Sequence, residues 1–334
     1  MISPLTRPDF TLPETSGASA PAPVAARAGL AGEADPEREL LARELGTQYQ
    51  VVRPLGRGAM GAVFLCRDLA LHRMVAVKVL RVDHADSEDA RERFRREARL
   101  LARMTHPNIV PVHAFGETPA ITYMVMKYVA GESLAERLWS EKRMSTSDAR
   151  RVLAELADAL EYAHRQGVVH RDLKPENILL DRESGSAMLA DFGVATMTSW
   201  HPSPDELRHA FGTPHFMAPE QALGQTDVDG RADLYALGVL GYLMLSGRLP
   251  FEGAAPSELV ARQLTDAPDP LARLAPRAPT DLVAVVERCL EPTPDDRFRA
   301  AREMHEALTT RRGRAAMAWP WVAGIVAVVG MLMR

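Results

Sequence analysis

The apolar residues of this chain change their spacing near residue 130, and this change constrains the fold more than any other feature. Before it, short strand-like runs separated by Gly and polar turns occupy residues 49–56, 61–68, 74–80 and 121–129. One helical stretch, 86–104, interrupts them. From Ser147 onward the apolar residues recur at helical spacing, as at Val152, Leu156 and Leu160. We predict an α+β fold with a small β-rich lobe of about 49–128 and a larger, mainly helical lobe of about 131–311.

Length, charge and cysteine content narrow the class of protein. A chain of 334 residues is long enough for about two domains or for one large bilobed domain with a buried core. Its net charge of −4 gives no basic face for nucleic acid, so we expect no nucleic-acid partner. The two cysteines, Cys66 and Cys289, lie far apart in the sequence, which argues against a disulfide framework or a metal cluster and suits a reducing compartment.

The first 46 residues are expected to form a disordered tail. Five prolines stand among Ala, Ser and Thr in residues 1–31, and this stretch has neither the basic start nor the apolar run of a signal peptide. The following EADPERELLAREL could form a short helix, although a solvated spacer is the favoured interpretation.

A transmembrane helix is predicted at 315–333. This segment contains 19 residues without a charge, enough to span a bilayer as a helix. Arg311, Arg312 and Arg314 precede it, and Trp319 and Trp321 occupy positions typical of a membrane interface. The basic flank predicts that the residues before this segment stay in the cytoplasm. The segment would then be a tail anchor, and the protein would not be a receptor. The alternative is a buried helix of the core.

A glycine-rich loop is the first segment with a chemical signature. Gly56, Gly58 and Gly61 stand between two predicted strands, where backbone N–H groups could approach a chain of phosphates. A dinucleotide-binding fold would require a helix after the last glycine, but GAVFLCR is typical of a strand. A plain hairpin turn remains the alternative for this segment taken alone.

Lys78 and Glu97 are predicted to form an ion pair. Lys78 ends the third predicted strand and is one of only four lysines in the chain. Glu97 shares the apolar face of the following helix with Phe94 and Leu101, and a carboxylate there needs a partner. The alternatives are a solvent-facing lysine and a hydrated glutamate at the edge of the apolar face.

The strongest signal is the loop from His170 to Asn177. Asp172, Lys174 and Asn177 place a base, a cation and an amide within six residues. A short hairpin then leads to Asp191-Phe192-Gly193, whose carboxylate could join the Asn177 amide at a magnesium ion. This set suits phosphoryl transfer, which requires positioning and charge neutralisation more than covalent chemistry.

With these motifs in order, the chain resembles the eukaryotic-like (Hanks-type) serine/threonine protein kinases, particularly the membrane-anchored bacterial ones, over about residues 47–311. The resemblance implies the bilobal protein-kinase fold, ATP and Mg²⁺, with Mn²⁺ as a substitute. It implies that Asp172 orients the substrate hydroxyl, that Lys174 neutralises the γ-phosphate, and that Asn177 and Asp191 ligate the metal. It also implies a nucleotide site made of Leu55, Gly56, Gly58, Gly61, Val63, Ala76, Lys78, Met126, Val129 and Leu179.

The resemblance further implies supporting and regulatory residues. Glu97 would pair with Lys78, Glu220 with Arg297, and Asp233 would anchor the catalytic-loop backbone. Arg171 before Asp172 is typical of kinases that are switched by phosphorylation between Asp191 and Glu220. The candidate phosphosites there are Thr196, Thr198, Ser199 and Ser203, of which the two threonines are favoured.

We therefore expect an enzyme that phosphorylates Ser and Thr of protein substrates and phosphorylates its own activation loop. We expect it to lie at the bacterial inner membrane as a single-pass protein with a cytoplasmic kinase domain. Homodimerisation remains open. The alternatives are a kinase-like scaffold without activity and a small-molecule phosphotransferase. The first would need a lost catalytic residue, and the second usually lacks the long segment that ends in Ala218-Pro219-Glu220.

Overall fold

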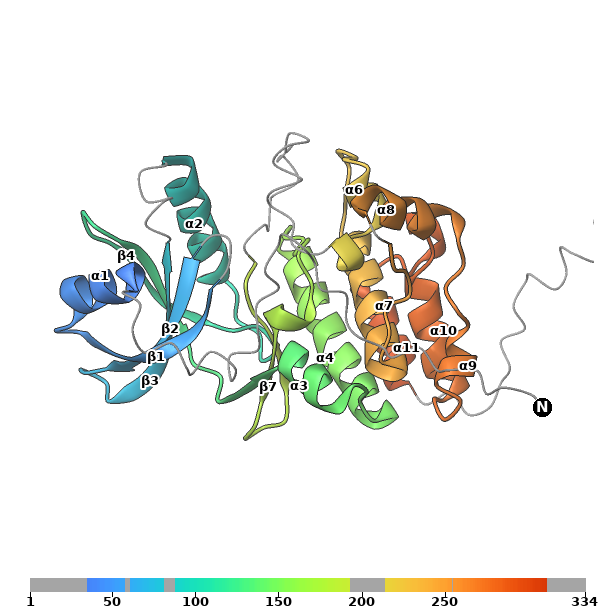
Figure 1. The fold of residues 1–334 in the computed structure, drawn as a ribbon, viewed down its shortest axis with the longest axis horizontal. Coiled ribbons are helices and arrows are strands. Elements are labelled where there is room, and N and C mark those ends of the chain that lie inside the picture. Colours follow the sequence, from blue (N-terminus) through green and yellow to red (C-terminus); the bar gives the residue numbers. More distant parts are fainter. Residues whose placement is uncertain (1–34, 58–60, 81–87, 193–213, 254, 311–334) are drawn as a thin grey trace, which may run out of the picture.

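The computed structural model describes residues 35–57, 61–80, 88–192, 214–253 and 255–310. Two lobes lie side by side, with the strands of the first lobe at one end of the molecule and most of the helices at the other (Figure 1). The small lobe has a five-stranded antiparallel sheet in the order β1-β2-β3-β5-β4. Its strands are β1 (Tyr49–Arg57), β2 (Gly61–Asp68), β3 (Arg73–Leu80), β4 (Val112–Glu117) and β5 (Thr122–Lys127).

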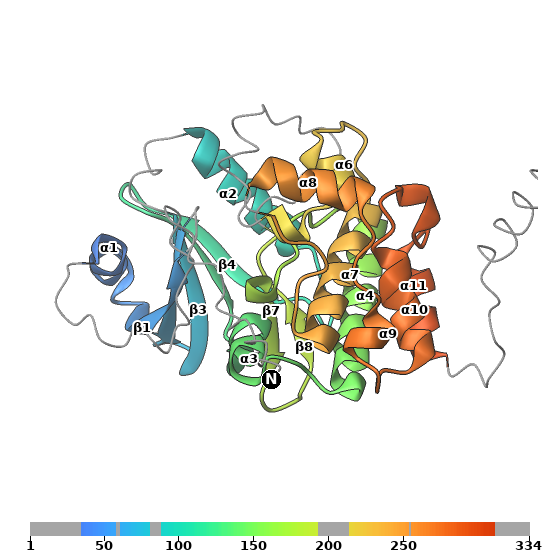
Figure 2. The ribbon, with the colours of Figure 1, turned by 45° about the vertical axis from the view of Figure 1, so that its right-hand side comes forward.

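The two faces of this sheet are covered by different helices. One face packs against α2 (Glu88–Leu101), whose apolar side buries Phe94 and Leu101 as its spacing predicted. The other face packs against α1 (Pro36–Leu45), which lies on the side of the sheet away from the large lobe (Figures 1 and 2). Because strand residues alternate between faces, β3 and β5 contribute to both contacts, with Leu80 and Met124 on the side of α2 and Val77 and Val125 on the side of α1.

Helix α1 occupies the segment that we expected to be a solvated spacer. Asp35 caps it by accepting a hydrogen bond from the Arg38 amide at 3.1 Å, and Pro36 follows at the first helical position. Leu41 and Leu45 are buried against the outer face of the sheet. The segment is therefore part of the small lobe, because its apolar side chains cover strand residues that would otherwise face water.

The large lobe is mainly helical, as predicted. Its longer helices are α3 (Leu134–Glu141), α4 (Thr146–Arg165), α7 (Arg231–Ser246), α8 (Pro256–Thr265), α10 (Thr280–Cys289) and α11 (Ala301–Thr309). Shorter turns of helix are η3 (Pro175–Asn177), η4 (Pro214–Phe216), α6 (Pro219–Ala222), α9 (Leu271–Leu274) and η5 (Pro294–Asp296). Helix α7 is buried on nearly all sides, and α4 and α10 pack against it.

A small sheet connects the lobes. Strands β6 (Gly131–Ser133), β7 (Ile178–Asp181) and β8 (Ala187–Leu189) pair antiparallel in that order. The chain between α2 and β4 also bonds to β8, because the Val110 amide donates to the Leu189 carbonyl at 2.9 Å and the Leu189 amide donates to the Asn108 carbonyl at 2.8 Å. The predicted hairpin near 178–190 is therefore present and lies where the lobes meet.

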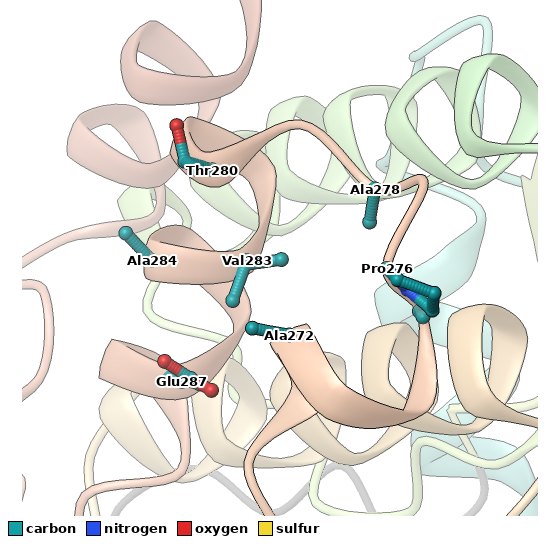
Figure 3. Close-up of a pocket in the computed structure, with 8 residues that line it drawn as sticks. Ala272, Pro276, Ala278, Thr280, Val283, Ala284 and Glu287 are labelled. Carbon is teal, nitrogen blue, oxygen red and sulfur yellow. The ribbon is translucent and has the colours of Figure 1, made fainter.

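A pocket of about 250 Å³ lies in the large lobe between α9 and α10 (Figure 3). Small apolar side chains such as Ala272, Ala278 and Ala284 line it, and Glu287 supplies a carboxylate. One oxygen of that carboxylate already accepts a hydrogen bond from the Leu271 amide at 3.1 Å. None of the residues predicted for catalysis or nucleotide binding lines this pocket.

The predicted transmembrane segment, 315–333, lies outside the described residues. Within the described part of the chain, no helix is both long enough and apolar enough to cross a bilayer.

Candidate active site

The alternation of β2, β3 and β5 places the predicted nucleotide residues of the small lobe on one face. Val63 lies opposite Lys78, and Ala76 lies opposite Met126 in the sheet register. Ala76 and Lys78 are two residues apart on β3, so both side chains point to the same face of the sheet. This is the inner face, toward α2 and the large lobe.

Residues from both lobes complete an apolar surface next to these strands. Val129, which follows β5, and Met188 on β8 are buried together with Val110, and Met126 and Leu179 pack against them. The resemblance to the kinases implied nucleotide contacts for Met126, Val129 and Leu179. The fold therefore gathers these three residues from the end of the small sheet and from β7 of the large lobe.

Gly56 and Gly61 of the predicted phosphate loop have different surroundings. A Cβ added to Gly61 would lie 2.3 Å from the Val79 carbonyl oxygen, so the close approach of β3 requires glycine there. A Cβ added to Gly56 would meet no atom within 4 Å. Gly61 is thus required by the sheet itself, whereas Gly56 borders open space.

The predicted ion pair between Lys78 and Glu97 is present. The Lys78 Nζ lies 3.1 Å from Glu97 Oε1, and both side chains are buried. The same ammonium donates a hydrogen bond to a carboxylate oxygen of Asp191, which follows β8. One buried cation therefore holds two carboxylates, one from α2 and one from the large lobe.

The pKa values of the two carboxylates shift in opposite directions. Burial raises the pKa of Glu97 to about 7, although the Lys78 ammonium opposes the rise. Asp191 keeps nearly half of its side chain exposed, and the Lys78 ammonium outweighs the cost of desolvation there and lowers the pKa of Asp191 to about 2. At neutral pH Asp191 is an anion, which is the form that ligates a divalent cation.

Lys174 and Asn177 both lie within hydrogen-bond distance of Asp172. The Lys174 Nζ donates to Asp172 Oδ2 at 2.7 Å, and the Asn177 Nδ2 donates to the same oxygen at 3.1 Å. The Asn177 Nδ2 also donates to the Asp172 carbonyl at 2.8 Å. Because the amide nitrogen makes these bonds, the amide oxygen is the atom by which Asn177 could ligate Mg²⁺.

Asp233 on α7 holds the backbone of this loop. It is buried, and its two carboxylate oxygens accept hydrogen bonds from the amides of His170 at 2.9 Å and Arg171 at 2.8 Å. Arg171 itself adopts a left-handed backbone conformation, with φ of 63°. The loop therefore turns sharply just before Asp172, and a buried anion from another element fixes that turn.

Glu220 and Arg297 form the predicted ion pair, with two parallel hydrogen bonds. Their N–O distances are 2.7 and 2.9 Å, and both side chains are buried. The Arg297 guanidinium also lies 4.9 Å from the centre of the Tyr235 ring. This contact joins α6, which contains the end of the Ala218-Pro219-Glu220 motif, to the core of the large lobe.

The model of the family described as "Protein kinase domain" matches residues 49–309. This chain belongs to the protein kinase family.

Several curated bacterial kinases are similar to the matched region. Serine/threonine-protein kinase pkn2 of Myxococcus xanthus is 41% identical over 271 residues, which cover 79% of this chain and 32% of the relative. PknB of Mycobacterium tuberculosis is 38% identical over 269 residues (79% of this chain, 43% of the relative), and PrkC of Bacillus subtilis is 33% identical over 271 residues (81% and 41%). The chain spans about a third to two fifths of the length of these relatives.

Sequence reasoning missed the role of His164 in this kinase. Its Nε2 lies 2.8 Å from Asp233 Oδ2, the same carboxylate that accepts from the His170 amide. His164 lies in the last turn of α4, whose C-terminus leads toward the catalytic loop. That position was visible in the sequence, but its partner on α7 was not.

His170 has a packing role in this site. Its ring lies against that of Phe192, with centroids 4.5 Å apart, and the residue is fully buried. Burial lowers the pKa of His170, so its imidazole stays neutral.

Some predicted residues of the kinase lie outside the described part of the chain. They are Gly58 of the phosphate loop and the candidate phosphosites Thr196, Thr198, Ser199 and Ser203.

Proposed function

We propose that this protein kinase transfers the γ-phosphate of ATP to Ser and Thr hydroxyls of proteins in the presence of Mg²⁺. The observation that carries the proposal is the convergence of Lys78, Asp172, Asn177 and Asp191 at the junction of the lobes. The curated relatives are named serine/threonine-protein kinases, which supports the same substrate class.

The donor set at this junction fits magnesium. Asp191 offers a carboxylate and Asn177 an amide oxygen, and both are hard oxygen ligands. Among the described residues, no group of three or more His, Cys, Asp or Glu could hold a metal without other ligands. A magnesium ion that bridges nucleotide phosphates needs only one or two protein ligands, so Asn177 and Asp191 suffice. When bound, the ion supplies positive charge against the phosphates.

Each residue of the chain then has a defined task. Lys78, held by Glu97, would meet the α- and β-phosphates beneath the strand that carries Leu55 and Gly56. Asp172 would accept or orient the proton of the substrate hydroxyl, which makes the oxygen a better nucleophile. Lys174, 2.7 Å from Asp172, would neutralise charge on the γ-phosphate. The apolar group around Val129 and Leu179 would enclose the adenine, together with Val63, Ala76 and Met126.

A phosphotransfer assay tests this function. Full-length protein would be incubated with labelled ATP, Mg²⁺ and a generic protein substrate, with an aminoglycoside as a small-molecule acceptor in parallel. We expect label on Ser and Thr of the protein only.

Asp172→Asn should lower kcat by about 10²- to 10⁴-fold, because it removes a catalytic base while it preserves the shape of the side chain. Label on the aminoglycoside alone would favour a small-molecule phosphotransferase. Absence of transfer by wild type would favour an inactive scaffold.

We also propose autophosphorylation between Asp191 and Glu220, with Thr196 or Thr198 as the favoured acceptor. Arg171, immediately before Asp172, supports this proposal, because its guanidinium could pair with a phosphate on Thr196 or Thr198. Mass-spectrometric mapping of the wild type and of a variant without hydroxyls at Thr196, Thr198, Ser199 and Ser203 tests it. Equal activity in both proteins would disprove the regulatory role.

Membrane attachment through 315–333 is a separate proposal, supported by the uncharged 19-residue segment and its arginine flank. It would place the kinase domain on the cytoplasmic face of the bacterial inner membrane. Fractionation of cells that express the protein with and without 315–333 would test it. Recovery of both forms in the soluble fraction would contradict it.

A further inference from the structure

Arg57 links the end of β1 to a helix outside the region matched by the family. The match begins at residue 49, whereas α1 occupies Pro36–Leu45. In the sheet register, Gly56 pairs with Val63 on the inner face, and Arg57 pairs with Ala62. Ala62 is buried in the cluster that contains Leu41 and Leu45 of α1. Successive residues of β1 therefore serve opposite faces, Gly56 toward the nucleotide side and Arg57 toward α1.

The Arg57 guanidinium meets two carboxylates from the start of α1. Its Nη1 donates to Glu37 Oε2 at 2.7 Å, and its Nη2 forms an ion pair with Asp35. Glu37 is buried, with 4% of its surface exposed, and a buried carboxylate needs such a partner. Asp35 is also the N-cap of α1, so the contact joins the first turn of the helix to the last residue of the strand.

The strand that this contact holds is paired on one side only. Strand β1 is at the edge of the order β1-β2-β3-β5-β4, so only β2 pairs with it. Its register with β2 shifts twice, between Val51 and Arg53 and between Pro54 and Gly56. The second shift lies immediately before Arg57. An edge strand with interrupted pairing gains more than a central strand from an anchor outside the sheet.

We propose that Arg57, clamped by Glu37 and Asp35, is a positioning residue. It holds the backbone of Leu55 and Gly56 in the position required for nucleotide binding. The inference rests on the proposed function, because it assigns a role in the same ATP site. Arg57 faces away from the nucleotide and acts through the backbone of β1. Helix α1 is then a part of the nucleotide-binding lobe that the family match does not include.

The test compares ATP affinity and strand dynamics in full-length variants. Arg57→Met removes the charge and keeps the length of the side chain, and Glu37→Gln removes one partner with little change in shape. We expect each to raise the Kd for Mg²⁺-ATP about three- to tenfold, while kcat at saturating ATP stays within about twofold. The double variant should bind no more weakly than the weaker single variant, because both changes break the same contact. Arg57→Lys should recover part of the affinity.

A second readout does not depend on activity. Backbone amides of residues 51–57 should exchange hydrogen faster in Arg57→Met than in wild type, without nucleotide. Arg53→Met is the matched control, because it removes an arginine of the same strand whose guanidinium hydrogen-bonds only the neighbouring Pro54 carbonyl among the contacts described. It should leave both ATP affinity and the exchange of residues 51–57 unchanged.

The outcomes separate this proposal from the proposed function. If wild type binds and uses ATP but all Arg57 and Glu37 variants bind it equally well, the clamp is overturned and the kinase assignment stands. Unchanged exchange at residues 51–57 in Arg57→Met also overturns it. If wild type binds no ATP, both proposals fail. Melting curves identify any variant that fails to fold. If Arg57→Met or Glu37→Gln fails to fold, ATP affinity and amide exchange are compared between wild type and Asp35→Asn, which is a milder change of the same contact.

Discussion

Arg297 is the largest fully buried side chain of the described residues, and the carboxylate of Glu220 balances its positive charge. Glu220 accepts two of its hydrogen bonds, and backbone carbonyls accept the others. Glu220→Gln would leave a buried guanidinium without a counter-ion. We expect the free energy of unfolding to fall by about 3 kcal/mol, measured by urea denaturation.

The matched control for this change is Glu306→Gln. Glu306 pairs with Arg302 at 3.7 Å, but both side chains are more than 60% exposed. The cost there should be no more than about 0.5 kcal/mol, because water screens the pair. Equal losses in the two variants would contradict the importance of burial at Glu220.

His170 gives the kinase a pH-dependent stability. Burial lowers its pKa, so the folded protein keeps the ring neutral while the unfolded chain protonates it below about pH 6.5. The unfolded state then binds more protons, and the free energy of unfolding falls as the pH drops below 6.5. One such group contributes a slope of up to about 1.4 kcal/mol per pH unit.

His170→Phe should reduce that slope, because phenylalanine keeps a ring against Phe192 and cannot titrate. Chemical denaturation at several pH values between 7 and 5 measures the effect. His72→Asn is the control, since His72 is exposed in the turn between β2 and β3. An unchanged slope in His170→Phe would show that other groups carry the acid sensitivity.

At the scale of elements, α1 gives the clearest difference from the sequence-based expectation. The signals of a helix start were present as Asp35, Pro36 and Glu37. What the sequence could not show was the surface that α1 covers, because Phe64, Val77 and Val125 come from three different strands. Helix formation is a local property, whereas docking depends on residues brought together by the fold.

Leu41→Ala tests whether α1 is integral to the small lobe. Leu41 is fully buried between α1 and the sheet, so its truncation should lower the free energy of unfolding by about 2–5 kcal/mol. Denaturant titration followed by circular dichroism measures it. Glu39→Ala, at an exposed position of the same helix, should change stability by about 0.5 kcal/mol or less. A negligible loss in Leu41→Ala would return this segment to the status of a spacer.

The strands and helices of the site itself were predictable because their motifs are local. The segment from His170 to Asn177 contains its own hydrogen-bond partners within six residues. The two-residue alternation likewise placed Ala76 and Lys78 together. In contrast, the contact of Lys78 with Asp191 joins residues 113 apart, and the contact of His164 with Asp233 joins residues 69 apart. Without the resemblance to a family, spacing alone would not have paired Asp233 with the catalytic loop.

At the scale of the whole molecule, the proposed ligand would contact both lobes at once. Lys78 lies in the small lobe, and Asn177 and Asp191 lie in the large lobe. Mg²⁺-ATP should therefore stabilise the entire domain, by about 2.7 kcal/mol at a concentration one hundred times the Kd. A rise in the melting temperature measures this effect.

Asp191→Asn should remove the part of that rise that depends on Mg²⁺, because the variant lacks the carboxylate ligand. The rise produced by nucleotide in the presence of a chelator should change much less. If Asp191→Asn showed the same Mg²⁺-dependent rise as wild type, Asp191 would not be a metal ligand in this kinase.

The position of α1 also has a practical consequence for recombinant work. A fragment that begins at Tyr49, where the family match starts, would lack Leu41 and Leu45. The outer side of its sheet would then expose a continuous apolar patch, the usual cause of poor solubility in truncated domains. A fragment that starts a few residues before Asp35 would retain the natural cover and is the better starting point for crystallisation.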